Sequence, residues 1–242
     1  MITVTEHGDV AEITVDRHDK RNALDVAHLT ELTAAVDGSV SAGRRALVIT
    51  GAGSAFCAGA DFGGVYGDGF RTALYAALRA ITSAPIPVIA AVNGPAIGAG
   101  TQLAIACDLR VVAPTAKFAI PTARNGLAVD PWTIGRLAGL AGGATARAVL
   151  LACDTLDATA ALTRGLADRI GTVEDARVLA QEIASYAPLS LRYSKHAVQA
   201  LSEPDIWDDI LDDEFDQCWT SADFTESQLA RAENRSPKFV GK

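Results

Sequence analysis

Short apolar runs rich in β-branched residues alternate with helical patterns through the first half of the chain. The runs at 45–50, 87–92 and 109–112 are typical of buried strands. Apolar residues at helical spacing occupy 70–83 and 99–107, between these runs. Strands that alternate with helices form a mostly parallel sheet with right-handed crossovers. The sequence therefore predicts an α/β fold.

The two ends of the chain carry other patterns. Residues 2–6 and 10–16 alternate apolar and polar about a turn at 7–9, which predicts a β-hairpin. Apolar residues from Val26 to Val36 have helical spacing. From about Trp132 onward the pattern is almost entirely helical, with amphipathic helices expected at 174–185, 189–200 and 206–232. Such a helical end often packs against a neighbouring subunit, and a solvated charged face is the alternative.

The composition is that of a globular protein. Of the 242 residues, 49% are hydrophobic and 21% are charged, so the chain can bury a large core. No Pro/Ser-rich or Gly/Ser-rich linker divides it. The net charge of −8 disfavours sequence-independent binding to nucleic acid, which needs a basic face. It does not exclude a single polyanionic ligand, which a few side chains and a helix N-terminus can hold.

Cysteine usage and the N-terminus indicate a cytoplasmic protein. Cys57, Cys107, Cys153 and Cys218 are scattered without a C-x-x-C pair, which argues against a disulfide framework and a zinc site. The histidines have no metal-ligand spacing. The first residues lack the apolar segment of a signal peptide, and no apolar run reaches the roughly 18 residues of a membrane span. We therefore expect no membrane span and no metal.

Two glycine-rich stretches, 51–61 and 93–102, follow two of the expected strands. Small residues at 58–60 and 98–100 let a ligand approach the main chain closely, and a helix that starts near Ala99 would direct free N–H groups at it. Two such N–H groups form an oxyanion hole. Either stretch alone is equally consistent with a tight turn, but together they favour a binding site.

Several separated motifs resemble the crotonase superfamily, the enoyl-CoA hydratases and isomerases. Segments 56–61 and 93–100 are similar to the two oxyanion loops of that family. Segment 21–24 resembles its N-terminal segment around the adenine and pantetheine of CoA, and segments 107–110 and 237–239 also fit. The motifs stand in the family's order along nearly the whole chain, so chance agreement is improbable.

The resemblance implies a crotonase (ClpP-like) spiral of ββα units. Residues 1–185 would form this core, and residues 186–242 would form a helical trimerisation region. The protein would assemble as a homotrimer or as a hexamer built from two trimers. Its ligand or substrate would be an acyl-CoA thioester of fatty-acid metabolism, with no separate cofactor.

The resemblance also assigns site residues. The backbone N–H groups of Ala60 and Ala99 would hold the thioester carbonyl oxygen, where an enolate develops negative charge. Contacts with CoA would come from Arg21, Asn22, Ala23, Leu24, Ala58, Asp61, Phe62, Lys238 and Phe239.

Both glutamates of the family's hydratases are absent at the matching positions. Gln102 stands where the first is expected, and Thr122 stands where the second is expected. Glutamine does not titrate near neutral pH, and threonine is too short and too weakly acidic to act as a general acid or base. Each such group usually contributes about 10²–10⁴-fold, so hydration should be nearly abolished.

Asp130 has two interpretations of equal weight. It resembles an Asp that moves a proton along the acyl chain in dienoyl-CoA isomerases, and it also stands where a helix N-cap before Pro131 is expected. A chlorobenzoyl-CoA dehalogenase, which uses an Asp nucleophile, is the weakest option because no histidine lies between His28 and His196.

Three functions therefore stay open. The chain is an acyl-CoA-binding protein of the hydratase/isomerase type that stabilises a thioester oxyanion, a carrier without chemistry, or an isomerase that uses Asp130. Gln102 and Thr122 favour binding over hydration.

Overall fold

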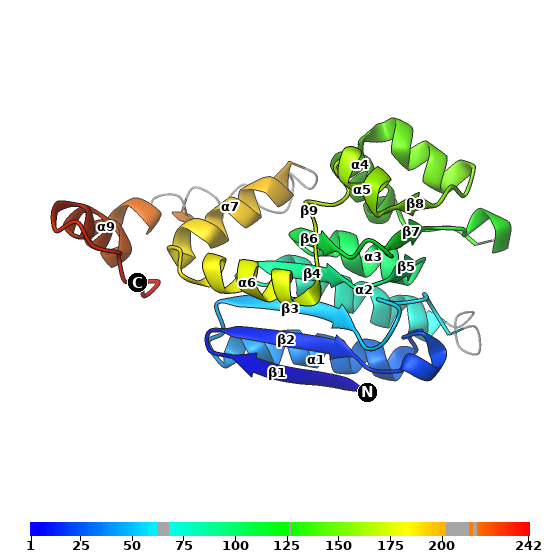
Figure 1. The fold of residues 1–242 in the computed structure, drawn as a ribbon, viewed down its shortest axis with the longest axis horizontal. Helices are drawn as coiled ribbons and strands as arrows, with labels where there is room; N and C mark the ends of the chain where they lie inside the picture. The colour runs from blue at the N-terminus through cyan, green and yellow to red at the C-terminus, as the bar shows by residue number, and fades with distance from the viewer. Residues whose placement is uncertain (62–67, 126, 202–212, 215–216) are drawn as a thin grey trace.

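A mostly parallel sheet forms the centre of the molecule in the computed structural model (Figure 1). The structure describes residues 1–61, 68–125, 127–201, 213–214 and 217–242. Six described strands lie in the spatial order β1 (Ile2–His7), β2 (Val10–Val15), β3 (Ala46–Gly51), β4 (Val88–Val92), β6 (Leu109–Val112) and β9 (Arg169–Ile170). β1 runs antiparallel to β2, and the other neighbours are parallel. The predicted hairpin and parallel core are confirmed.

A second, smaller sheet was not predicted. It contains β5 (Pro95–Ile97), β7 (Lys117–Ala119) and β8 (Leu156–Asp157), with β5 parallel to β7 and β7 antiparallel to β8. Strands of two or three residues are too short to show an alternating pattern, so only the fold reveals them.

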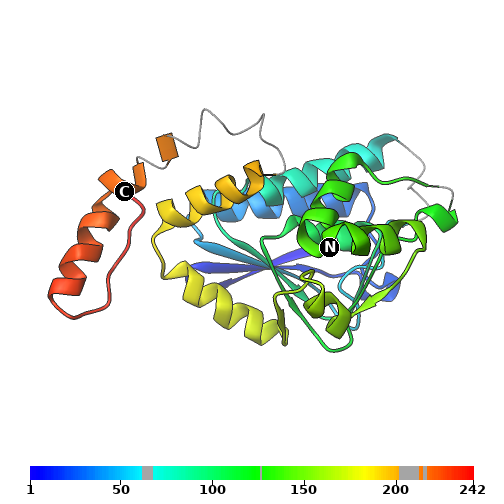
Figure 2. The same ribbon diagram turned by 90° about the horizontal axis from the view of Figure 1, so that it is seen from above.

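The helices cover both faces of the large sheet. The described helices are α1 (Val26–Ser41), α2 (Asp68–Ser83), α3 (Ala99–Ala106), α4 (Pro131–Leu151), α5 (Ala158–Thr163), α6 (Val173–Ala184), α7 (Pro188–Ala200) and α9 (Ala222–Ala232), with 3-10 turns η1 (His18–Lys20) and η2 (Ala123–Asn125). Figure 2 shows α1 and α2 on one face of the sheet and α6 on the other.

Strand β3 shows why helices must cover both faces of the large sheet. Leu47 and Ile49 belong to the core cluster that includes residues of α1 and α2, whereas Val48 belongs to the cluster with α6. Side chains alternate between the faces of a strand, so a central strand of a covered parallel sheet is apolar at every position. All residues of β3 are buried.

The chain repeats one unit of two short strands and a helix. β4, β5 and α3 follow one another, and then β6, β7 and α4 do the same. The first strand of each unit joins the large sheet and the second joins the small sheet. In each unit the chain therefore passes from the large sheet to the small sheet and then enters a helix, as expected for a spiral of ββα units.

The prediction of one continuous helix over 206–232 is wrong at Ser221. Residues 202–212 and 215–216 lie outside the described part of the chain, and α9 begins only at Ala222. The Ser221 hydroxyl accepts the Phe224 N–H at 3.0 Å, as an N-cap does, so a new helix starts there. In both views α9 stands apart from the sheet (Figures 1 and 2).

Among the described helices, α4 alone is long and apolar enough by length and composition to cross a membrane. It nevertheless contributes Leu137, Ala146 and Val149 to the core. Gly142 interrupts it with a φ of 79°, which is a conformation that favours glycine. The absence of a membrane span and the division at residue 185 stay predictions.

Candidate functional site

A cavity of about 250 Å³ lies where the two glycine-rich stretches leave the large sheet. Its described lining residues come from the first stretch (Ala58, Gly59, Ala60), from α2 (Phe70, Arg71, Leu74, Tyr75), from the second stretch and α3 (Ile97, Gly98, Ala99, Gln102), and from segment 121–129 (Pro121, Thr122, Asn125, Leu127, Ala128, Val129). The cavity thus contains both predicted N–H donors and both positions of the absent glutamates.

The two glycine-rich stretches run side by side and touch through their backbones. Cys57 N donates to Pro95 O at 3.1 Å, and Ile97 N donates to Cys57 O at 2.9 Å. A Cβ atom on Gly100 would lie 2.2 Å from Cys57 O. Burial raises the pKa of the Cys57 thiol to about 12, so this side chain packs as a neutral group. Small residues here are a packing requirement.

A methyl group at position 100 should therefore separate the stretches. We expect Gly100→Ala to lower the free energy of unfolding by about 3 kcal/mol, the upper end of typical overpacking costs, measured by urea denaturation. Gly139→Ala is the matched control, because Gly139 lies in α4 with open space around its Cβ position and should gain about 0.5–1 kcal/mol. Equal stability of the two variants would contradict the close approach.

In the first stretch, the N–H of Ala60 differs from its neighbours in its hydrogen bonding. The other three N–H groups of residues 58–61 have acceptors, which are Arg21 O for Ala58 at 3.0 Å, Cys57 Sγ for Gly59 at 3.4 Å and Leu24 O for Asp61 at 2.7 Å. Within the described residues, no acceptor is found for the Ala60 N–H. This donor is available to a ligand.

The peptide unit between Gly59 and Ala60 orients that donor. Its carbonyl, Gly59 O, accepts the Leu24 N–H at 2.8 Å. Because a planar trans peptide directs its C=O and N–H oppositely, the Ala60 N–H points away from Leu24. Ala60 is also one of the residues that line the cavity.

The N–H of Ala99 is the second available donor. Ala99 is the first residue of α3, where an N–H has no partner inside the helix, and no other acceptor is found among the described residues. Gly98 precedes it with φ 55° and ψ −115°, a combination that side chains disfavour. Gly98 N is anchored to Ala119 O at 2.8 Å. The turn at Gly98 therefore sets the direction of the Ala99 donor.

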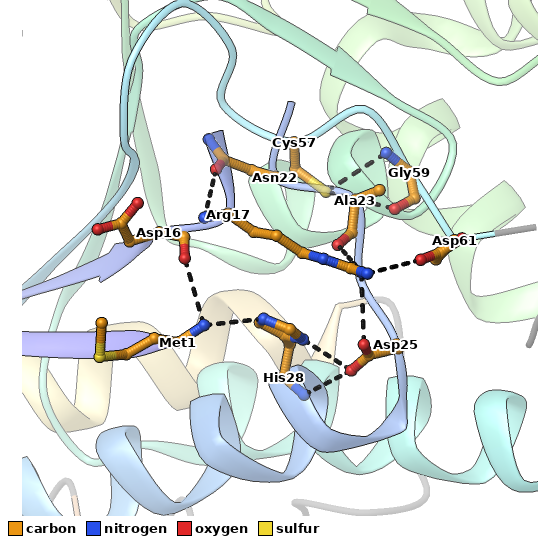
Figure 3. Close-up of polar contacts among 10 residues, drawn as sticks. All are labelled: Met1, Asp16, Arg17, Asn22, Ala23, Asp25, His28, Cys57, Gly59 and Asp61. Atoms are coloured by element: carbon orange, nitrogen blue, oxygen red, sulfur yellow. Dashed lines mark hydrogen bonds and ion pairs between the residues drawn. The ribbon is translucent and has the colours of Figure 1, made fainter. Parts of the chain in front are cut away.

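Segment 21–24 lies against the first stretch (Figure 3). Asn22 is fully buried, and its Nδ2 donates to Ala52 O at 2.8 Å and Ala55 O at 2.7 Å. Leu24 is also fully buried, whereas Arg21 is exposed and Ala23 is half-buried. The side chains of Asn22 and Leu24 thus support the loop. Arg21 and part of Ala23 are the groups of this segment that face solvent.

Gln102 is held by two side chains from the start of α4. Its Nε2 donates to Thr133 Oγ1 at 2.8 Å and to Asp130 Oδ2 at 3.2 Å. A carboxylate only accepts hydrogen bonds, so the amide nitrogen must face Asp130. Gln102 also lines the cavity, one helical turn after Ala99. It can offer a ligand a carbonyl acceptor, but no proton.

Asp130 is the N-cap of α4. Its Oδ1 accepts the Thr133 N–H at 3.0 Å, and its Oδ2 accepts the Thr133 hydroxyl at 2.7 Å as well as the Gln102 amide. Both carboxylate oxygens are therefore in use, and Asp130 is not among the described residues that line the cavity. The geometry is that of a cap which also holds Gln102.

Residues of α2 form a further wall of the cavity. Phe70 and Leu74 are four residues apart, as are Arg71 and Tyr75, so the members of each pair are neighbours on the helix surface. Burial, followed by the charge of Asp130, raises the pKa of the Tyr75 hydroxyl, so this group stays a proton-bearing donor. Phe62 lies outside the described residues.

Lys238 and Phe239 do not meet this cavity within the chain. They line a separate cavity with His7, Asp9 and Arg45, at the hairpin and the start of β3. The cavity that Ala60 and Ala99 line follows the C-terminal ends of β3 and β4, so it lies at the opposite ends of the strands. Within one chain, the structure therefore does not bring these two predicted CoA contacts to the other site residues.

The chain is similar to known proteins over its whole length. The model of the enoyl-CoA hydratase/isomerase family matches residues 5–242. A protein described as probable enoyl-CoA hydratase echA6 of Mycobacterium tuberculosis is 45% identical over 245 residues, covering 100% of both chains. A solved enoyl-CoA hydratase/carnithine racemase from Magnetospirillum magneticum is 28% identical with a TM-score of 0.91, covering 100% of this chain and 96% of its own. An enoyl-CoA hydratase subunit I from Geobacillus kaustophilus is 31% identical with a TM-score of 0.89, covering 100% and 98%.

Proposed function

Because this chain belongs to the enoyl-CoA hydratase/isomerase family, we propose that its cavity binds an acyl-CoA thioester with the carbonyl oxygen between the N–H groups of Ala60 and Ala99. Family membership confirms the resemblance to crotonases, and the solved relatives confirm the crotonase spiral. In this function the protein holds the thioester without hydrating it efficiently.

The support for the proposal is that Ala60 and Ala99, from two different segments, line one cavity and that neither backbone N–H has an acceptor among the described residues. A thioester carbonyl needs such donors when negative charge develops on its oxygen, and losing one donor typically costs about 3 kcal/mol. The backbone orients both donors, through the hydrogen bond of the Gly59 carbonyl to the Leu24 N–H and through the turn at Gly98.

The proton-transfer groups of a hydratase do not accompany these donors. Gln102 cannot accept a proton, and Thr122 is too weak an acid or base for the task. Because each group is worth about 10²–10⁴-fold, the two replacements together should nearly abolish hydration. The site therefore supports thioester binding better than turnover.

Isomerisation by Asp130 receives no support from the geometry. A proton shuttle must reach the acyl chain, but Asp130 caps α4, holds Gln102 and is not among the described residues that line the cavity. Binding without chemistry, as in a carrier, is the function that we favour. The place in fatty-acid metabolism, the homotrimer or hexamer and the cytoplasmic location stay predictions.

The test combines binding and turnover. We expect a saturated acyl-CoA to bind the wild-type protein in calorimetry, while the absorbance of crotonyl-CoA or of a longer 2-enoyl-CoA stays constant. Gly98→Ala should weaken binding by about tenfold, the value of one misdirected hydrogen bond. Gly142→Ala is the matched control, because Gly142 also has a positive φ and open space but lies away from the cavity.

Three outcomes would contradict the proposal. Rapid loss of 2-enoyl-CoA absorbance would show that hydration proceeds without the glutamates. Absence of acyl-CoA binding would remove the thioester as ligand. Equal affinities of the Gly98→Ala and Gly142→Ala variants would show that the Ala99 donor does not contact the ligand.

A further inference from the structure

The Arg17 guanidinium contacts Ala23, Asp25 and Asp61 (Figure 3), and Asp61 directly follows Ala60 in the sequence. Its Nη1 donates to Ala23 O at 3.1 Å and lies 3.4 Å from the Asp25 carboxylate. Its Nη2 lies 2.8 Å from the Asp61 carboxylate. On the basis of the proposed function, we infer that Arg17 is a positioning residue for the Ala60 N–H that polarises the thioester carbonyl.

Two peptide units in series connect Arg17 with that donor. Arg17 donates to Ala23 O, and the opposite side of the same peptide unit carries the Leu24 N–H. The Leu24 N–H donates at 2.8 Å to Gly59 O, and the opposite side of that second unit carries the Ala60 N–H. Each planar unit passes the direction of one hydrogen bond to the next. The orientation of the Ala60 donor therefore depends on the guanidinium two peptide units away.

The same series strengthens the donor electronically. A hydrogen bond from a charged guanidinium is stronger than one between neutral groups, and hydrogen bonds in a chain polarise one another. Arg17 withdraws electron density at Ala23 O, which makes the Leu24 N–H a better donor to Gly59 O. By the same effect the Ala60 N–H becomes a better donor to a ligand carbonyl.

Arg17 also balances the negative charge beside the oxyanion position. Asp61 directly follows Ala60, and an unpaired carboxylate there would oppose negative charge on the ligand oxygen. The ion pair at 2.8 Å offsets this charge, and Arg17 and Asp61 are mostly shielded, with 22% and 29% of their side chains exposed. Removing the guanidinium therefore weakens the site in two ways. The negative charge of Asp61 is no longer balanced, and the Ala60 N–H is no longer held in its orientation.

Asp25 fixes Arg17 from the other side. Asp25 is the N-cap of α1, and its Oδ1 accepts the His28 N–H at 3.0 Å and contacts the His28 ring Nδ1 at 2.7 Å. Burial alone would raise the pKa of Asp25, but the hydrogen bonds from His28 and the charges of His28 and Arg17 lower it overall. Asp25 is thus an ionised anchor that ties Arg17 to the start of a helix.

The test uses a chromophoric ligand, the CoA thioester of 4-dimethylaminocinnamic acid. The absorption of such a donor–acceptor chromophore moves to longer wavelength when its carbonyl is polarised, so the shift measures the oxyanion donors separately from affinity. We expect Arg17→Met to lose most of the shift and roughly threefold to tenfold in affinity, since one of two donors is misaligned. Arg17→Lys should show an intermediate shift, because lysine keeps the charge but cannot form the fork to three partners.

Arg44→Met is the matched control. Arg44 also lies 2.8 Å from a carboxylate, that of Glu6, has the same 22% side-chain exposure and donates to one backbone carbonyl, Gly8 O. It is on the hairpin side of the sheet, away from the cavity. The Arg44 variant should keep the full shift and affinity.

The wild-type protein separates failure of this inference from failure of the proposed function. A wild type that binds no thioester, or binds it without a shift, removes the proposed function itself. A wild-type shift that persists in every folded Arg17 variant overturns the role of Arg17 and leaves the oxyanion site intact. If Arg17→Met does not fold, as judged by circular dichroism, the shift of Arg17→Lys decides.

Discussion

Replacing Gln102 and Thr122 by glutamates is expected to leave hydration of crotonyl-CoA weak, whereas adding Asp130→Asn should raise it by about 10²–10⁴-fold. The reason lies in the contact between Gln102 Nε2 and Asp130 Oδ2 at 3.2 Å. A glutamate at position 102 would replace this amide donor by a second carboxylate. Two carboxylates at hydrogen-bond distance repel each other when both are ionised.

Such a pair favours sharing one proton between its members, because two adjacent negative charges disfavour each other. A glutamate locked in this pair could not take or deliver protons independently, as the hydratase reaction requires. Asp130→Asn would offer the glutamate at position 102 an amide donor in place of the charge, and asparagine remains a good N-cap for α4. The triple variant therefore recreates the charge state that two catalytic glutamates need.

The measurement is the initial rate of absorbance loss with crotonyl-CoA for the double and triple variants. Asp157→Asn in the double-glutamate background is the matched control, because Asp157 caps α5 through the Ala160 N–H at 2.8 Å and is absent from the described cavity lining. This control should be as slow as the double variant. If the double variant is already as fast as the triple variant, the Asp130 carboxylate does not hinder catalysis by a glutamate at position 102.

Arg110→Met is expected to lower the free energy of unfolding by about 3–5 kcal/mol, the cost of breaking a buried charged network. Only 2% of Arg110 is exposed. Its guanidinium donates to three carbonyls and a carboxylate, which are Leu166 O at 2.6 Å, Cys107 O at 2.8 Å, Asp108 O at 3.3 Å and Asp168 Oδ2 at 3.0 Å. Methionine fills much of the same volume but removes this donor from the carbonyl oxygens of Leu166 and Cys107, whereas Asp168 Oδ2 keeps the backbone N–H of residue 110 at 2.7 Å.

Urea denaturation of Arg110→Met beside Arg44→Met tests this expectation. The Arg44 pair with Glu6 is near the surface, with 61% of the Glu6 side chain exposed, and such pairs contribute less than about 1 kcal/mol. Arg110 is not among the described lining residues of the cavity, so folded Arg110→Met protein should still bind acyl-CoA. A loss below about 1 kcal/mol in both variants would show that the buried network is replaceable.

Local patterns predicted the elements that carry the site. The runs at 45–50 and 87–92 are the strands β3 and β4, and the expected helix at 99–107 is α3. These predictions succeed because apolar periodicity and glycine content depend on neighbours in sequence. The small sheet and the break at Ser221 were missed because strands of two or three residues and a single capping hydroxyl leave no periodic signal.

Asp130 shows where reasoning from sequence stops. Its position before Pro131 is consistent with both a helix cap and a pocket acid, and the sequence favours neither. The structure shows the cap through the contact with Thr133, and it adds a contact with Gln102 across 28 residues of chain. Such a contact depends on how α3 and α4 pack, which spacing along the chain does not encode.

The sequence by itself determined that this chain has small residues for two backbone donors and no glutamate at position 102 or 122. Those are statements about residue types, so no packing can change them. Only the tertiary structure decided that Gln102 is bound to a carboxylate and that Arg17 reaches the oxyanion loop through two peptide units. Hydrogen bonds act over about 3 Å, so the groups that they join are chosen by the folded backbone and not by distance along the chain.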